Sequence, residues 1–159
     1  MERLSRFVEG LCTAGAFFSA LFMIGIVILI MIEVVMRSLF NTSTMITSEF
    51  SGYFLVALVV LGLGHTLHHE GHIRITLLRG RLGPVGRKRL DLVVGSLGLC
   101  LCLFALYFTV LMVLDTRSLG MRADTVAETP LWMPQAVIPV GLGLFALQLF
   151  AFLVRRARS

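Results

Sequence analysis

Charged residues are scarce in this sequence, and so are cysteines. Asp, Glu, Lys and Arg make up only 14% of the 159 residues, against about 25% in soluble domains, and 57% of the residues are hydrophobic. The three cysteines, Cys12, Cys100 and Cys102, all lie in apolar stretches, which argues against a disulfide framework. No basic face is interleaved with aromatic residues, so no nucleic-acid partner is expected. The composition indicates a membrane protein.

Four long apolar runs account for the hydrophobic excess. They cover residues 11–36, 50–67, 92–114 and 131–154. At 1.5 Å per residue, each approaches or exceeds the roughly 30 Å hydrocarbon core of a bilayer. The first run is far longer than the 7–15 apolar residues of a signal peptide, so we expect a retained helix. The predicted fold is all-α, an integral membrane four-helix bundle that forms one transmembrane domain over residues 1–159.

The distribution of Lys and Arg predicts the orientation of this bundle. Eleven of the fourteen cations lie in the two terminal tails and in the loop between the second and third runs. The other two loops hold three, which are Arg37, Arg117 and Arg122. Cytoplasmic segments carry the excess of Lys and Arg, so both termini are predicted to be cytoplasmic.

All four histidines lie within eight residues, and on a continued helix they would share a face about 100° wide. They are His65, His68, His69 and His72. The i, i+4 spacing suits zinc, but the HExxH order is absent, Glu70 points to another side, and Gly71 weakens the helix. We interpret the cluster as the polar end of a transmembrane helix and predict no metal site and no catalytic residue.

The segment after the histidines mixes apolar residues with cations. Ile75, Leu78, Leu82 and Val85 would fall within an arc of roughly 80° on a helix. This pattern predicts a short amphipathic segment on the cytoplasmic leaflet, between the second and third helices. Its guanidinium groups would reach lipid phosphates, and its six cations are Arg74, Arg79, Arg81, Arg87, Lys88 and Arg89.

Glu33 is the one Asp, Glu, Lys or Arg residue inside a predicted span. Three roles remain open for it: an i, i+4 pair with Arg37, a contact with a partner subunit, or proton coupling. The sequence has no nucleophile–base pair, phosphate loop or carboxylate dyad. We therefore expect no enzymatic activity and no cofactor on this chain.

Other residues suggest how the helices begin and pack. Thr47 and Ser48 supply candidate N-cap oxygens, Glu49 supplies a first-turn carboxylate, and Trp132 suits an interfacial aromatic belt. Pro139 should kink the last helix. Small residues that would allow close helix approach are Gly15, Ser19, Gly95, Gly98, Gly141 and Gly143.

Two motifs carry a family resemblance. The stretch "GLGHTLHHEGHIRITLLRGRLGP" resembles the segment after the second helix in the DctQ-like small membrane subunits of tripartite ATP-independent periplasmic (TRAP) transporters, through His72, Arg74 and the residues around them. The stretch "LWMPQAVIPVGLGLFALQL" is similar to the final helix of that family, with Pro139 and Gly141 at its core. Glu49 also matches a glutamate common at that position.

The resemblance implies a non-transporting scaffold in the bacterial inner membrane. Its partners would be a large multi-spanning membrane subunit, which carries sodium-coupled transport, a periplasmic binding protein that delivers an organic acid, and membrane lipids. The residues proposed to face partners or lipids are Glu33, Arg37, Glu49, His72, Arg74, Arg79, Arg81, Trp132, Pro139 and Gly141. Two alternatives are a stand-alone proton-coupled exporter that uses Glu33, and a haem- or quinone-reactive four-helix membrane subunit.

Overall fold

The computed structural model describes residues 2–68 and 83–158. In these residues the chain forms helices α1 (Glu2–Phe40), α2 (Thr47–His68), α4 (Pro84–Ser118), α5 (Trp132–Gln135) and α6 (Val137–Arg158). The described residues contain no strand, only an isolated bridge between Arg122 and Pro130. Helices α1, α2, α4 and α6 are each long and apolar enough to cross a membrane. The predicted all-helical, four-helix membrane fold is confirmed.

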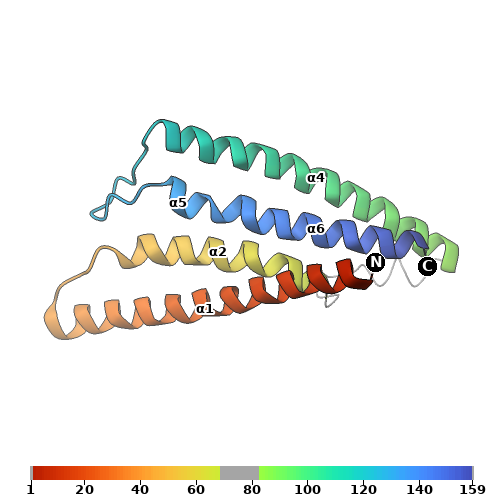
Figure 1. The fold of residues 1–159 in the computed structure, drawn as a ribbon. Coiled ribbons are helices and arrows are strands. Elements are labelled where there is room, and N and C mark those ends of the chain that lie inside the picture. The colour runs from red at the N-terminus through yellow and green to blue at the C-terminus, as the bar shows by residue number, and fades with distance from the viewer. Residues whose placement is uncertain (1, 69–82, 159) are drawn as a thin grey trace.

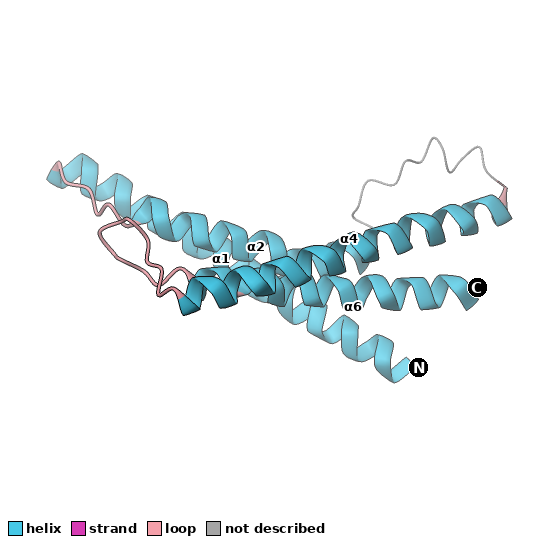
Figure 2. Ribbon diagram, turned by 90° about the horizontal axis from the view of Figure 1, so that it is seen from above, coloured by secondary structure: helices cyan, strands magenta, loops and turns pink. Residues whose placement is uncertain are grey.

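The four long helices run side by side, with both chain termini at one end (Figure 1). We call that end the terminal end. The opposite end, which we call the loop end, holds the α1–α2 connection (residues 41–46) and the α4–α5 connection (residues 119–131). The view from above shows that the helices cross at an angle and splay apart toward their ends (Figure 2).

Helices α2 and α6 occupy the middle of the arrangement. Helix α2 packs against α1 and α6, whereas α4 packs mainly against α6. A buried cluster of Cys102 on α4 with Ala146 and Leu149 on α6 holds α4 against α6. Consequently α1 and α4 form the two flanks, and both expose apolar side chains along much of their length.

Helices α1, α2 and α4 are longer than the apolar runs that predicted them, whereas the fourth run is divided between α5 and α6. Helix α1 ends where Asn41 takes a left-handed conformation (φ 49°), which Asn tolerates, and the Thr42 N–H donates to the Met36 carbonyl at 3.4 Å. Helix α4 begins at Pro84, a favoured first position because proline has no N–H to leave unpaired. The cations of residues 87–89, predicted to lie in a loop, are therefore on the first turns of α4.

The expected distortion at Pro139 is present one turn earlier. The helix is interrupted at Ala136, between α5 and α6. Proline lacks the N–H that would bond to the carbonyl of Gln135, and its ring crowds that carbonyl. The break therefore falls between Gln135 and Pro139.

Glycines mark the close contacts between helices. A Cβ built on Gly141 would lie 2.4 Å from Val60 Cγ1 and 2.8 Å from the Val60 carbonyl oxygen, so α6 and α2 touch through backbone there. A Cβ on Gly15 would lie 3.0 Å from the Leu61 carbonyl oxygen, so α1 and α2 also approach closely, though less so than α6 and α2 at Gly141. Gly143 has nothing within 4 Å of such a Cβ, so the predicted close approach at Gly143 is wrong.

Candidate functional site

The densest polar cluster of the described residues surrounds the Glu33 carboxylate at the loop end. Its Oε1 accepts hydrogen bonds from Arg37 Nε at 2.7 Å and from the Ser43 hydroxyl at 2.6 Å. Its Oε2 accepts from the Thr44 hydroxyl at 2.5 Å, the Thr44 backbone N–H at 3.1 Å and the Thr47 hydroxyl at 3.2 Å. We call these five residues the Glu33 network.

The geometry of the short α1–α2 connection makes this convergence possible. Asn41 and Met45 both have positive φ, so the chain turns sharply twice within five residues. The turns bring two loop residues and the first residue of α2 over a carboxylate that lies about two turns before the end of α1. The Thr44 and Thr47 hydroxyls also lie 3.0 Å apart.

The network determines what Glu33 can do. A carboxylate has about four lone-pair sites, and five donors occupy them here. The side chain is only 12% exposed, whereas that of Arg37 is 68% exposed. The predicted i, i+4 pair with Arg37 is present, and the carboxylate connects α1 to the start of α2. Contact with a partner subunit and proton coupling stay predictions.

Glu49 makes the second connection at this end. It lies in the first turn of α2, as predicted, and accepts a hydrogen bond from the Tyr53 hydroxyl at 2.8 Å. It also accepts from the hydroxyl of Thr125, which belongs to the α4–α5 connection. Thr47 and Ser48 lie inside α2 rather than before it, so the prediction that they act as N-caps is wrong.

The α4–α5 connection is an ordered hairpin-like loop. The Ala123 N–H donates to the Thr129 carbonyl at 3.0 Å, and the Leu131 N–H donates to the Met121 carbonyl at 3.2 Å. At its base, the Arg117 guanidinium lies 5.2 Å from the ring centroid of Trp132, close enough for a cation–π contact. The aromatic-belt role predicted for Trp132 stays a prediction.

Two ion pairs join helices at the terminal end. Arg155 on α6 donates to Glu9 on α1 at 2.9 Å. Its neighbour Arg156 donates to Asp91 on α4 through Nε at 2.9 Å and through a terminal guanidinium nitrogen at 2.5 Å. Helix α6 thus connects both flanks of the molecule through adjacent arginines.

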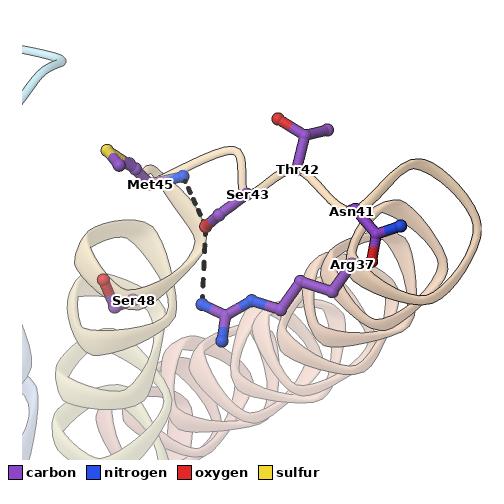
Figure 3. Close-up of a pocket in the computed structure, with 6 residues that line it drawn as sticks. All are labelled: Arg37, Asn41, Thr42, Ser43, Met45 and Ser48. Carbon is purple, nitrogen blue, oxygen red and sulfur yellow. Dashed lines mark hydrogen bonds between the residues drawn. The ribbon is translucent and has the colours of Figure 1, made fainter.

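An open pocket of about 610 Å³ adjoins the Glu33 network. Figure 3 shows the Arg37 side chain extending from α1 toward Ser43, with Ser48 on the neighbouring helix. The lining residues are Arg37, Asn41, Thr42, Ser43, Met45 and Ser48. All but Met45 are polar, and Arg37 belongs to α1, one of the two apolar flanks.

Several predicted site residues cannot be placed. His72, Arg74, Arg79 and Arg81 lie outside the described residues, as does the predicted amphipathic segment from residue 73 to Leu82. Of the histidines, His65 lies in α2, which the structure follows to His68. Across the described ranges, 2–68 and 83–158, no three His, Cys, Asp or Glu residues are grouped as a metal site would require.

Sequence reasoning missed most of the polar contacts. Ser43 and Thr44 bind Glu33, and Thr125 binds Glu49. None of these three contacts follows from helix periodicity. One signal was available: seven of the nine residues in "NTSTMITSE" are Asn, Ser, Thr or Glu, beside the lone carboxylate of an apolar span. The ion pairs of Asp91 and Glu9 join positions 65 and 146 residues apart, for which no local signal exists.

These observations define a class of protein. It is a multi-pass helical membrane protein whose spans are apolar and pack through small residues, and whose helices are joined by ion pairs at the terminal end. The chain belongs to the DctQ component family of tripartite ATP-independent periplasmic transporters, whose family model matches residues 26–159.

A relative supports the same membership. The chain is 32% identical over 75 residues to a Haemophilus influenzae protein named as a candidate TRAP transporter small permease protein. The alignment covers 47% of this chain and 47% of that protein, so the match spans about half the length of each. The family to which the resemblance pointed is therefore confirmed.

Proposed function

We propose that this chain is the small permease subunit of a TRAP transporter and that it acts as a scaffold. It packs against a large multi-spanning membrane subunit, which carries the sodium-coupled pathway. A periplasmic binding protein delivers the substrate, an organic acid. The assembly resides in the bacterial inner membrane, and this chain itself catalyses no reaction.

The observation that carries the scaffold role is the chemistry of the spans. A substrate path needs polar groups near the middle of the membrane. Glu33 is the single Asp, Glu, Lys or Arg residue in the predicted spans, it lies at the loop end, and its oxygens are occupied by five donors. The apolar flanks of α1 and α4 offer contact surface to lipid and to a second membrane subunit.

The orientation of the scaffold follows from its cations. With the terminal end in the cytoplasm, the α1–α2 and α4–α5 connections face the periplasm. The ordered α4–α5 loop, held to α2 through Thr125 and Glu49, then offers a firm surface on the side from which a binding protein arrives.

Co-purification tests the proposal directly. A tag on this chain should recover a large multi-spanning membrane protein from the native membrane in mild detergent. Matched variants separate specific assembly from nonspecific adhesion: Gly141→Leu disturbs the α2–α6 contact, and Gly143→Leu does not. Recovery should fall for the first variant and persist for the second. A chain that is recovered alone under conditions that keep it folded would contradict the proposal.

Reconstitution separates this proposal from a stand-alone exporter. Liposomes that contain this chain alone should show no solute flux, and Glu33→Gln should change nothing in that assay. Flux that requires Glu33 would favour the exporter and overturn the scaffold role.

A further inference from the structure

We propose that the pocket at the loop end binds the phosphate group of a membrane phospholipid, whose acyl chains lie along α1. This inference requires the chain to sit in a bilayer, and it does not depend on the transporter assignment. The ligand is defined by its chemistry: a phosphodiester attached to two apolar chains.

The polar part of the pocket suits a phosphate. Arg37 is the single cation among the six lining residues. Its hydrogen bonds to Glu33 and Ser43 use two of the five N–H donors of a guanidinium and leave the others for a ligand. The hydroxyls of Thr42 and Ser48 and the amide of Asn41 line the same pocket and can donate to phosphate oxygens.

Arg37 is one of several donors to the Glu33 carboxylate. The Glu33 carboxylate also accepts four hydrogen bonds from Ser43, Thr44 and Thr47, which are neutral donors. Because these donors share the stabilisation of Glu33, the largely exposed guanidinium can attract a second anion.

The surface below the pocket suits acyl chains. Val34, Ile30, Val27 and Met23 share with Arg37 a face of α1 about 80° wide. Their exposed fractions are 54%, 48%, 54% and 60%. We call these four residues the α1 stripe.

Pocket and stripe together favour a lipid over a soluble anion. The α1 stripe leads from the guanidinium toward the middle of the span, and at the pocket itself Met45 is 66% exposed. A phosphate above an apolar track is the layout of a lipid headgroup above its chains. A soluble anion would use the pocket and leave the stripe without a role.

The test measures lipid retained by the full-length chain. The chain, purified in detergent, is incubated with phosphatidylethanolamine, and bound lipid is counted by native mass spectrometry. Ser48→Trp fills the pocket without removing any member of the Glu33 network. Arg37→Gln removes the cation. Arg122→Gln is the matched control, because Arg122 lies in the α4–α5 connection, is 65% exposed, pairs with Glu128 and does not line the pocket.

We expect one retained phospholipid in the wild-type chain and in Arg122→Gln. Retention should fall about tenfold in Ser48→Trp and in Arg37→Gln, which corresponds to about 1.4 kcal/mol of binding free energy. Because Arg37→Gln also removes a contact to Glu33, Ser48→Trp decides the outcome if the arginine variant is unstable. Equal retention by Ser48→Trp and the wild type overturns the proposal.

A second arm distinguishes the source of the phosphate. Phosphatidylethanolamine should raise the apparent midpoint of thermal unfolding of the wild type, and this shift should be absent in Ser48→Trp. Inorganic phosphate at the same concentration should leave the midpoint unchanged. An equal shift with inorganic phosphate would assign the pocket to a soluble anion and overturn the lipid assignment.

Discussion

The α1–α2 hairpin and the α4–α6 pair are held together by different kinds of polar contact. In the hairpin, α1 and α2 follow each other in sequence, and a six-residue connection closes over Glu33. The Ser19 hydroxyl also donates to the Leu58 carbonyl at 2.7 Å within the span. In the α4–α6 pair, Arg156 of α6 binds Asp91 of α4 at the terminal end, and at the loop end Arg117 of α4 contacts Trp132 of the short helix α5.

The difference separates local from long-range stabilisation. Each contact of the Glu33 carboxylate joins residues at most 14 positions apart, so the loop end of the hairpin can form from its own sequence. The Asp91–Arg156 pair joins residues 65 positions apart and exists only after α4 and α6 have met. The α2–α6 contact at Gly141 then unites the two halves.

Gly141→Leu should have the largest effect on stability, because it forces the two halves apart. The new side chain would collide with Val60 backbone atoms, which cannot move without shifting α2. Overpacking of this kind costs about 1–3 kcal/mol. The apparent midpoint of thermal unfolding in detergent should drop clearly. Gly143→Leu, two residues away with open space around it, should leave the midpoint near that of the wild type. An equal drop of the midpoint in both variants would mean that the close α2–α6 contact at Gly141 does not limit stability.

Glu33→Ala should have the next largest effect and should be confined to the hairpin. The change removes the acceptor of five hydrogen bonds and leaves Arg37 without its carboxylate. Protease cleavage within residues 41–46 should become fast, while cleavage within residues 119–131 stays slow. Glu33→Gln keeps one acceptor oxygen and should lie between the wild type and alanine. Slow cleavage in the alanine variant would show that the connection is held by other contacts.

Asp91→Asn should weaken the α4–α6 pair more than Glu9→Gln weakens the contact of α6 with α1. The Asp91 side chain is 12% exposed and receives two donors from Arg156, whereas Glu9 is 31% exposed and its partner Arg155 is 45% exposed. We expect a loss of about 1 kcal/mol for the first and about 0.2–0.5 kcal/mol for the second. Unfolding at low salt and at 1 M salt checks this, because salt should erase the Glu9 effect first. The reverse order would contradict it.

Thr125→Val should have a smaller effect on stability than Asp91→Asn, about 0.5–1 kcal/mol, since it removes one hydrogen bond from Glu49. Its effect on the α4–α5 connection should be visible as faster proteolysis within residues 119–131. Tyr53→Phe removes another donor to Glu49 but does not touch that loop, so its loop should be cleaved at the wild-type rate. Identical cleavage of both variants would show that the Thr125–Glu49 hydrogen bond does not restrain the loop.

The sequence predicted features that depend on helix periodicity and composition. Four apolar runs identified the four long helices, and the i, i+4 rule identified the Glu33–Arg37 pair. Periodicity could not find Ser43 or Thr44 around Glu33, because their positions depend on the positive φ of Asn41 and Met45. A loop conformation of this kind is set by the contacts it closes.

Gly141 and Gly143 show a second limit. Both were predicted to admit a neighbouring helix, but residues two apart on a helix point about 200° from each other. One of them had to miss α2, and the phase of α6 relative to α2 decides which. Apolarity likewise predicted spans shorter than helices α1, α2 and α4, because a helix continues past the hydrocarbon wherever its backbone can stay paired.

The length of α1 has a mechanical consequence. Its apolar run, residues 11–36, measures about 39 Å at the rise of an α-helix, against a hydrocarbon layer of about 30 Å. An upright α1 would push hydrophobic side chains into water, so the helix has to lean or the bilayer has to swell around it. The tilt of α1 should therefore depend on the thickness of the membrane. A thinner or thicker bilayer should change the tilt of the whole protein relative to the membrane normal.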